Sequence, residues 1–405
     1  MPPSPGAVLV LAHVRDRAAV TVARALRRHG WRVGAGTPRV SAGFVGASRS
    51  VTATHVVPRA RGTLEEFVLA VTSAVEAGGY DLVVGAGDDW MAALSHVADQ
   101  LPVPVAAPSP AVVEQALDKL GLVESARAAG LGAPHTWIPS ADVDTASVPL
   151  PVVVKSRTHW RPGVTRRHRV EVELCHDVDA LAGQLARIRA HGDDPVLQQP
   201  VHGRLGALVG VVHEGRLLGR VQQVAPRLWP TPHGASARAV TVPVDPELAR
   251  RSEDLLRRIG WVGLVELQFL TGEDGTPWLI DFNGRPFGSV ALAESARPGL
   301  LDAWVRGALD LPVPELADGR VGVRYQWLAG DLRRARIERR GGLARDVGSS
   351  LRWAVGARHS LTRLDDPGPV AHLLTARFRP DDPDPDVEPA AAARTTPRST
   401  PPLAS

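Results

Sequence analysis

The chain has 405 residues, of which 44% are hydrophobic, and a formal net charge of +4 at pH 7. This length is enough for two or three packed domains, and so small a net charge gives little support for a nucleic-acid partner. The single cysteine, Cys175, excludes an intramolecular disulfide, and no apolar run approaches the roughly 20 residues that a membrane-spanning helix needs. The N-terminus has no basic region of the signal-peptide kind, so we expect a cytoplasmic protein without a membrane partner.

Strands and helices alternate along residues 1–110. We expect strands at 7–13, 81–87 and 103–107 and helices at 16–29 and 89–100. This alternation predicts an open α/β domain with a parallel sheet. The first strand is not followed by a dinucleotide fingerprint. The segment GAGDDW at 85–90 follows a strand, and open α/β sheets bind ligands at the carboxyl ends of their strands.

Strands outnumber helices along residues 111–312. We expect strands at 151–155, 205–212, 217–224, 237–244, 263–270 and 277–283, and helices at 177–190 and 245–259. Tight turns such as HEGR and TGEDGT join several of these strands, which is typical of antiparallel pairs. This region is therefore predicted to be α+β.

Residues 313–379 form a C-terminal extension in this interpretation. It contains a short strand at 322–328 and two arginine-rich helices near 331–355. Its role stays open between covering the site and mediating a homodimer. From residue 380 the chain is rich in proline and lacks aromatic residues, so we expect a disordered tail at 380–405.

Two residue types are almost missing from this chain. Of its 47 basic residues, 45 are arginine, the only lysines are Lys119 and Lys155, and Asn283 is the sole asparagine. A lysine ammonium is a compact point charge that reaches phosphate oxygens, whereas arginine is a wide planar fork. An asparagine beside carboxylates supplies a neutral oxygen ligand to a hard cation. The three residues thus indicate a nucleotide–metal site, with chance placement as the alternative.

Two neighbouring strands carry the strongest local motif. In GLVELQFL, Glu266 and Gln268 lie two positions apart and share one strand face, and in LIDFNGR the same holds for Asp281 and Asn283. Oxygen atoms of such side chains can bind Mg²⁺, and Arg285 follows where a fixed cation could face phosphoryl oxygens. The alternative is a solvated strand face. The apolar neighbours in LIDFN favour a buried strand, where polar groups require partners.

Together these segments resemble the ATP-grasp ligases. PWLIDFNGRPFGS resembles their metal-binding strand, DKLGLVESARAAGLGAPHT and PVVVK resemble the two segments that supply ATP lysines, and PVLQQPVHG resembles the hinge that holds adenine. The resemblance covers about 111–300. It implies an α/β N-terminal open-sheet domain followed by a two-lobed α+β ATP-grasp fold, with ATP and Mg²⁺ (or Mn²⁺) as cofactors. It assigns Lys119 and Lys155 to the ATP phosphates, Gln199, Pro200 and His202 to adenine, Gln268, Asp281 and Asn283 to the metal, and Arg285 to the phosphoryl group.

The motif departs from the usual family pattern at two metal positions. Asp281 stands where the family commonly has a glutamate, one methylene longer. The first ligand is also commonly glutamate, but here the position is Gln268, with Glu266 as the reserve ligand. Carbamoyl-phosphate synthetase is a family member with glutamine at this place, so the resemblance still implies a metal site.

The loop after Lys155 is a third departure, because it contains a single glycine and many basic residues. It could grip phosphate through its arginines or be a solvated surface loop. Its arginines are Arg157, Arg161, Arg166, Arg167 and Arg169.

The activity that the resemblance implies is ATP-dependent joining of a small-molecule carboxylate to an amine, through an acyl phosphate. Arg227 and Arg238 flank a Pro/Gly loop and are further candidates to contact the substrate. The alternative is a non-catalytic nucleotide-binding or regulatory protein with the same fold. His13, at the end of the first strand, is a candidate ligand or base, but no Cys/His spacing indicates a zinc site and no G-x-S-x-G motif indicates a serine hydrolase.

Overall fold

The N-terminal domain is built on a four-stranded parallel sheet. The computed structural model describes residues 5–39, 43–158, 160–164, 170, 172–231 and 234–375. The strands are β1 (Ala7–Leu11), β2 (Arg32–Thr37), β3 (Ala53–Val56) and β4 (Leu82–Gly85), and the helices are α1 (Arg17–Arg28), α2 (Gly43–Gly46), α3 (Glu65–Gly78) and α4 (Asp88–Val97). The strand order is β3-β2-β1-β4, with every pair parallel. All five residues of β1 are buried because helices cover both faces of the sheet.

The expectation of a full strand at 103–107 is wrong. Only an isolated parallel bridge joins Val83 to Val105, held by the bonds from Val83 N to Pro104 O (3.1 Å) and from Ala106 N to Val83 O (2.9 Å). Pro102 and Pro104 have no amide hydrogen to donate, so the segment cannot form a regular ladder.

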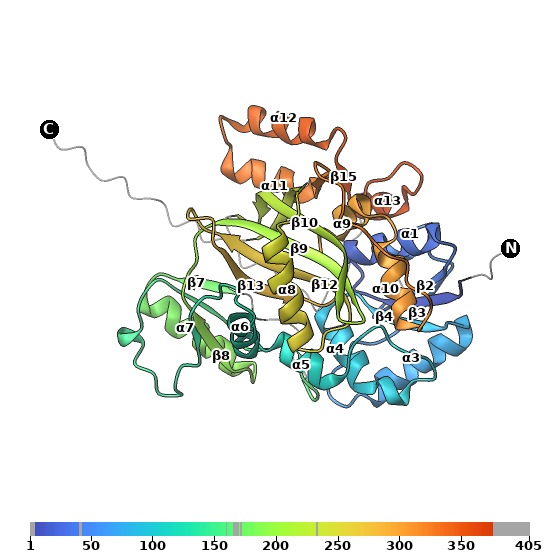
Figure 1. Cartoon of the computed structure of the whole chain (residues 1–405), viewed down its shortest axis with the longest axis horizontal. Helices are drawn as coiled ribbons and strands as arrows, with labels where there is room; N and C mark the ends of the chain where they lie inside the picture. The colour runs from blue at the N-terminus through green and yellow to red at the C-terminus, as the bar shows by residue number, and fades with distance from the viewer. Residues whose placement is uncertain are drawn as a thin grey trace.

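A small lobe follows, built on an antiparallel sheet in the order β5-β8-β6-β7. Its elements, with the helices that precede it, are α5 (Pro110–Leu117), α6 (Lys119–Ala128), β5 (Thr136–Trp137), β6 (Val152–Ser156), β7 (Glu173–Cys175), α7 (Val178–Ala190) and β8 (Pro195–Gln198). Apolar side chains of α7 pack against this sheet around the buried Cys175. Figure 1 shows this lobe and the N-terminal domain on either side of the large central sheet.

We expect Cys175 to be unreactive in the native protein. Burial raises the pKa of its thiol to about 11, and the side chain is fully buried. Two pKa units lower the thiolate fraction about a hundredfold, and the thiolate is the nucleophile. Alkylation by iodoacetamide at pH 8 should therefore be at least about a hundredfold slower than in guanidinium chloride. Equal rates in the two conditions would contradict the buried position.

The central element is a seven-stranded sheet in the order β13-β12-β9-β10-β11-β14-β15. Its strands are β9 (Arg204–His213), β10 (Arg216–Trp229), β11 (Ala235–Val242), β12 (Gly263–Thr271), β13 (Pro277–Asn283), β14 (Arg324–Gln326) and β15 (Arg358–His359). The first five lie within the predicted antiparallel region, and their pairings are antiparallel as expected. The helices after β11 are α8 (Pro246–Arg258), α9 (Val290–Ala296) and α10 (Leu300–Ala308). One face of the sheet packs on α6 and α8, and the other on α9, α10 and α1.

The C-terminal extension continues this sheet. It adds β14 and β15 and the helices α11 (Leu328–Glu338), α12 (Leu343–Ala354) and α13 (Gly368–Thr375). The strand expected at 322–328 is shorter than predicted, because Leu328 already begins α11. The predicted tail at 380–405 lies outside the described residues. Within the described part of the chain, no helix is long and apolar enough to cross a bilayer.

Arg24 attaches the extension to the N-terminal domain. This buried side chain of α1 donates from Nε to Asp366 Oδ2 (2.7 Å) and bonds the carbonyl oxygens of Ser360, Leu361 and Asp366. The hydroxyl of Ser48 donates to the same carboxylate (2.6 Å). Breaking such a buried ion pair leaves an uncompensated charge, so this contact holds α1 and the segment 360–366 to each other.

Candidate nucleotide and metal site

The polar motif residues of β12 and β13 lie on one face of the central sheet, as their spacing predicts. Glu266 pairs directly with Asn283 across the antiparallel ladder, and Gln268 pairs with Asp281. Side chains of directly opposed residues project to the same face. Glu266 and Asn283 are 3% and 4% exposed, so the alternative of a solvated strand face does not hold for them.

Glu266 is the centre of this cluster. Its Oε2 accepts hydrogen bonds from Gln268 Nε2 (2.9 Å) and Asn283 Nδ2 (2.9 Å). Gln223 on β10 and Ser289 lie near its Oε1, both at 3.4 Å. Since each amide gives its nitrogen to Glu266, each keeps its oxygen free of that contact. Glu266 therefore orients both amides. The carboxylate can only accept, so the amide nitrogen of each side chain, and not its oxygen, is the atom that faces it.

Burial also changes the charge of Glu266. It raises the pKa of this carboxyl to about 7, against the opposing effects of Gln268, Arg285 and Asn283. A buried carboxylate without a cation is costly, so a nearby positive charge favours ionisation. A cation bound beside the two strands would thus stabilise the carboxylate form of Glu266.

Lys119 reaches this cluster, and Lys155 lies on a neighbouring segment. Lys119 is the first residue of α6, is 4% exposed, and donates from Nζ to Asp281 Oδ1. Lys155 lies on β6 and is 7% exposed. The backbone links the two, because Lys119 N donates to the carbonyl of Arg157 (3.1 Å), two residues beyond Lys155. The two lysines of the chain therefore stand on adjoining segments, and one of them pairs with the predicted metal strand.

Arg285 connects the central sheet to the N-terminal domain. It makes a two-pronged ion pair with Asp88, from Nε to Oδ1 (3.0 Å) and from Nη2 to Oδ2 (3.1 Å). Asp88 begins α4, just after the carboxyl end of β4. Gly85 allows this helix to start so close to the strand, because a Cβ there would lie 2.7 Å from Met91 N. In the order β3-β2-β1-β4 the chain changes direction between β1 and β4, and ligands bind at such switch points.

A second charged group lies at the same switch point. His13 follows β1, and its Nε2 is 3.4 Å from Asp89 Oδ2, while its Nδ1 is 2.8 Å from Arg59 Nη2. Burial opposes ionisation of Asp89, but His13 and Arg59 outweigh it and hold the pKa of this carboxyl below its usual range. Burial raises the pKa of the nearby Asp16. Asp16 also caps α1 by accepting from Ala18 N and Ala19 N, a role that its place at the start of the helix indicates, whereas only the fold brings Arg59 here.

The hinge residues occupy the connection between the small lobe and the central sheet. Gln199, Pro200 and His202 lie between the end of β8 and the start of β9. Gln199 N donates to the carbonyl of His135 (2.9 Å), which fixes the connection to the segment before β5. The side chains of Gln199 and His202 are exposed. The backbone of this connection is thus the part that could contact a base.

The basic loop after Lys155 is partly bound within the protein. Arg157 pairs with Asp118 (Nη2 to Oδ2, 2.6 Å), and Arg161 donates to the carbonyl of Gly192. Arg166, Arg167 and Arg169 lie outside the described residues. Trp160 packs against the N-terminal domain and donates from Nε1 to the carbonyl of Ala60 (3.1 Å). The described part of this loop therefore lies against the N-terminal domain.

Of the two candidate arginines near the Pro/Gly loop, Arg238 is excluded from substrate contact. Its guanidinium is buried and bonds Asp331 (2.7 Å), Ser349 (3.1 Å) and Ser350 (3.0 Å). It is a structural residue of the sheet and the C-terminal helices. Burial and neighbouring arginines lower the pKa of Arg227, whose Nη1 donates to the carbonyl of Pro226 (2.7 Å).

The donor set on β12 and β13 fits Mg²⁺ bound together with a nucleotide. Its oxygens come from the carboxylate of Asp281 and the amides of Gln268 and Asn283, with the carboxylate of Glu266 beside them as the reserve ligand. Among the described residues, no group of three or more His, Cys, Asp or Glu side chains could hold a metal by itself. Mg²⁺ commonly uses one or two carboxylates and completes its shell with waters and substrate phosphates. The set therefore suits a metal that arrives with phosphate oxygens rather than a metal held in an all-protein cage.

Comparison with solved structures identifies the fold. The L-amino acid ligase of Bacillus licheniformis matches with a TM-score of 0.58 and 15% identity, over 76% of this chain and 74% of that one. The biotin carboxylase domain of the Hydrogenobacter thermophilus 2-oxoglutarate carboxylase was solved with MgADP. It matches with a TM-score of 0.60 and 15% identity, over 79% of this chain and 73% of that one. The Staphylococcus aureus N5-carboxyaminoimidazole synthetase matches with a TM-score of 0.58 and 12% identity, over 79% of this chain and 81% of that one.

Sequence comparison alone does not reach this result. No family model matches the chain, and no curated protein matches its sequence. At 12–15% identity the likeness lies in the arrangement of the elements. That arrangement, an open α/β domain followed by two lobes, is the one predicted. The chain therefore has the fold of the ATP-grasp ligases, as the motif resemblance implied.

Proposed function

We propose that this protein is an ATP- and Mg²⁺-dependent ligase that joins a small-molecule carboxylate to an amine, with release of ADP and phosphate. The observation that carries the proposal is the contact of Lys119 with Asp281 beside the buried Glu266–Asn283 pair. Two of the three rare residues of this chain, Lys119 and Asn283, thus lie beside carboxylates that suit a metal–phosphate complex, and Lys155 lies on an adjoining segment. The similar biotin carboxylase domain was solved in complex with MgADP and bicarbonate, which supports the binding of a nucleotide by this fold.

Each candidate residue has a role in this proposal. Lys119 and Lys155 hold phosphate oxygens as point charges. Asp281, Asn283 and Gln268 bind the metal, which would neutralise phosphate charge, and Glu266 orients the two amides. Arg285, fixed by Asp88, faces the phosphoryl or acyl-phosphate group. The hinge backbone around Gln199, Pro200 and His202 holds adenine.

The reaction needs little covalent help from the protein. A carboxylate oxygen of the acid attacks the γ-phosphorus of ATP, the bond to the ADP oxygen breaks, and an acyl phosphate forms. The amine nitrogen then attacks the acyl carbon, phosphate leaves, and the nitrogen loses a proton to give the amide. Catalysis in such transfers is positioning and charge neutralisation. The protein provides both through its fixed lysines and through Arg285.

Several broader inferences belong to the same proposal. We divide the chain into an N-terminal domain at 1–110, an ATP-grasp region at 111–312 and an extension at 313–379. A cytoplasmic setting, small-molecule substrates and a possible homodimer, with no nucleic-acid partner, fit a biosynthetic ligase.

The test is ADP and phosphate release from ATP and Mg²⁺ against a panel of amino acids and other small carboxylates, alone and in pairs. Release that depends on a carboxylate and an amine together supports the ligase and identifies its acceptor class. Tight ATP binding without release across the panel favours the alternative, a non-catalytic nucleotide-binding or regulatory protein. The replacement of a usual metal glutamate by Gln268 favours that alternative, and the retention of both lysines favours the enzyme.

Substitution of Asn283 tests the metal assignment. We expect Asn283→Ala to lower turnover about ten- to a hundredfold and to raise the Mg²⁺ concentration needed for half-maximal rate, because one oxygen ligand is lost. Thermal unfolding should move by only a few degrees, which separates loss of the site from loss of the fold. Gln222→Ala, a half-buried amide one position from Gln223 on β10, is the control. An unchanged Mg²⁺ dependence would remove Asn283 from the site.

A further inference from the structure

A cavity lies between the N-terminal domain and the C-terminal extension. It has a volume of about 810 Å³, within the range of roughly 300 to 1,000 Å³ that small-molecule pockets occupy. Its walls come from the β1–α1 loop and α2 on one side and from β14, α11, α12 and the segment 359–374 on the other. Lys119, Lys155, Arg285 and the β12–β13 cluster are not among its lining residues. The cavity is therefore distinct from the candidate nucleotide site.

The walls are apolar over much of their area. Phe44, Trp327, Leu332, Leu361 and Leu373 all face the cavity. Such a surface binds the hydrocarbon part of a ligand, because removing apolar area from water is favourable.

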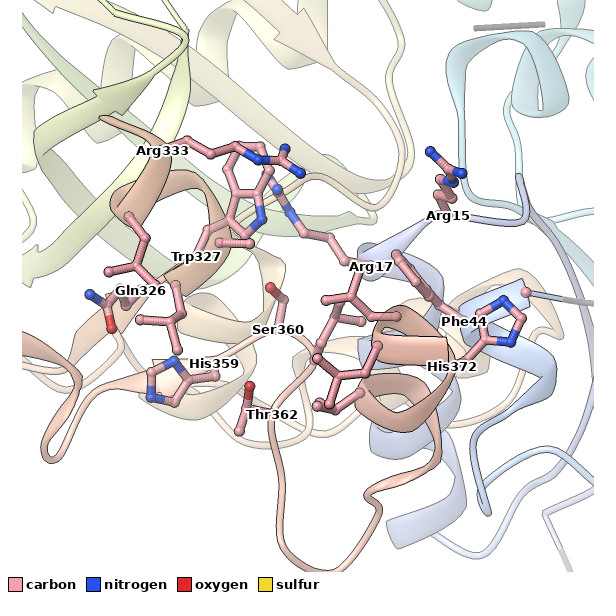
Figure 2. Close-up of a pocket in the computed structure, with 18 of the residues that line it drawn as sticks. Arg15, Arg17, Phe44, Gln326, Trp327, Arg333, His359, Ser360, Thr362 and His372 are labelled. Carbon is pink, nitrogen blue, oxygen red and sulfur yellow. The ribbon is translucent and has the colours of Figure 1, made fainter. Parts of the chain in front are cut away.

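The charge of the cavity is of one sign. Its 22 described lining residues include five arginines and no aspartate or glutamate, although 43 of the 405 residues of the chain are acidic. Figure 2 shows Arg17 reaching toward Trp327, with Arg15 and Arg333 along the upper side of the view. Arg17 lies 3.8 Å from the centre of the Trp327 ring and donates to the carbonyl of Gly288 (3.4 Å).

Three of these arginines have no partner for their guanidinium groups among the described residues. Within the part of the chain that the structure describes, the guanidinium groups of Arg15, Arg333 and Arg336 make no hydrogen bond or ion pair. Elsewhere on α11, Arg334 bonds three carboxylates. Unpaired guanidinium groups beside an apolar cavity are suited to a carboxylate, sulfonate or phosphate, which they can bind in a two-pronged geometry.

We propose that this cavity binds a small organic anion with an apolar body, at a site separate from the nucleotide. The apolar walls hold the body, and Arg333 and Arg336, three positions apart on α11, hold the anionic group, with Arg15 adding positive charge from the other side of the cavity. Arg17, which lines the cavity, donates to the carbonyl of Gly288, three residues beyond Arg285, so one backbone segment links the cavity to the proposed nucleotide site. The proposal does not depend on turnover, since binding can be measured without ATP.

The test is calorimetric titration of the full chain with 2-naphthylacetate and with the uncharged 2-naphthylacetamide, without ATP. We expect the acid to bind at least about tenfold more tightly than the amide, because only the acid pairs with the arginines. Arg333→Gln and Arg15→Gln should each weaken binding of the acid about three- to tenfold and leave binding of the amide unchanged. Arg352→Gln, an exposed arginine of α12 that does not line the cavity, is the matched control.

Three results would overturn the proposal. The first is equal affinity for acid and amide, and the second is an equal loss in the control variant. The third is binding of the acid only to a chain that ends at Thr375. That result would assign the cavity to the chain's own segment 376–405, which carries five acidic residues between Asp381 and Glu388.

Two further measurements separate this site from the proposed ligase activity. Binding of 2-naphthylacetate should persist in Lys155→Arg and in the presence of saturating MgADP, whereas displacement by MgADP would place the acid in the nucleotide site and contradict the proposal. A chain that binds the acid but releases no ADP with any substrate would retain this site and lose the proposed function. With ATP present, consumption of a bound acid distinguishes a reactant from an effector.

Discussion

Lys155→Arg should abolish nucleotide-dependent turnover although it keeps the positive charge. Lys155 is 7% exposed on β6, in a site that we propose holds ATP phosphates. A guanidinium is wider than an ammonium and cannot take the same point-charge position without displacing its neighbours. We expect the rate of ADP release to fall at least a hundredfold, which corresponds to about 2.7 kcal/mol of transition-state stabilisation. The measurement is ADP release at saturating ATP, with ATP affinity determined separately.

Arg189→Lys provides the reverse exchange on the same lobe. Arg189 is exposed on α7, and its Nη2 donates to the carbonyl of Ser140 (2.9 Å). The Arg189→Lys variant should leave both the rate of ADP release and the affinity for ATP unchanged. Wild-type ATP affinity and rate in Lys155→Arg would refute the role of Lys155, provided that the variant unfolds at the wild-type temperature.

Local patterns in the sequence were sufficient to predict the strand faces of the candidate site. The alternation in GLVELQFL and LIDFN placed Glu266, Gln268, Asp281 and Asn283 on one face, and the observed register pairs them directly. This works because the period of two is a property of the strand itself and needs no knowledge of distant residues. The same holds for the parallel order of the N-terminal sheet, which follows from alternating strands and helices.

Contacts between distant segments could not be predicted in the same way. Asp88 and Arg285 are 197 positions apart, and no local pattern pairs them. For Arg238, the local sequence led to a wrong prediction. Its place beside a Pro/Gly loop suggested a substrate contact, but the carboxylate that binds it belongs to Asp331, 93 positions later. Only the tertiary fold determines which of 45 arginines are structural.

The cavity between the N-terminal domain and the C-terminal extension also depends on long-range packing. Its walls combine the segment from Val14 to Phe44 with the segment from Gln326 to Leu374, at opposite ends of the described chain. Neither segment contains a motif, and the C-terminal extension had no assigned role from sequence. Its two edge strands and Arg24 explain how it is held against the N-terminal domain. A function for this region therefore emerges only from the folded structure.

Arg334→Met should strongly destabilise the protein. The guanidinium of Arg334 is fully buried and bonds Asp331 (2.9 Å), Asp346 (2.7 Å) and Glu338 (2.8 Å). Removing one partner of a buried ion pair leaves uncompensated charge and costs about 3 to 5 kcal/mol. Methionine fills much of the same volume, so the loss should come from charge rather than from a cavity. Denaturant unfolding at pH 7 measures it, with the neighbouring exposed Arg333→Met as the control.

The pH dependence distinguishes lost charge pairing from lost packing. Arg334 holds the pKa of Asp346 below its usual value. A carboxyl whose pKa is lowered by folding stabilises the native state above its unfolded pKa, and this contribution disappears as the pH falls through the folded pKa. The stability difference between wild type and Arg334→Met should therefore be largest at neutral pH and shrink below about pH 4. A difference that stays constant from pH 7 to pH 3 would attribute the loss to packing, because apolar contacts do not titrate.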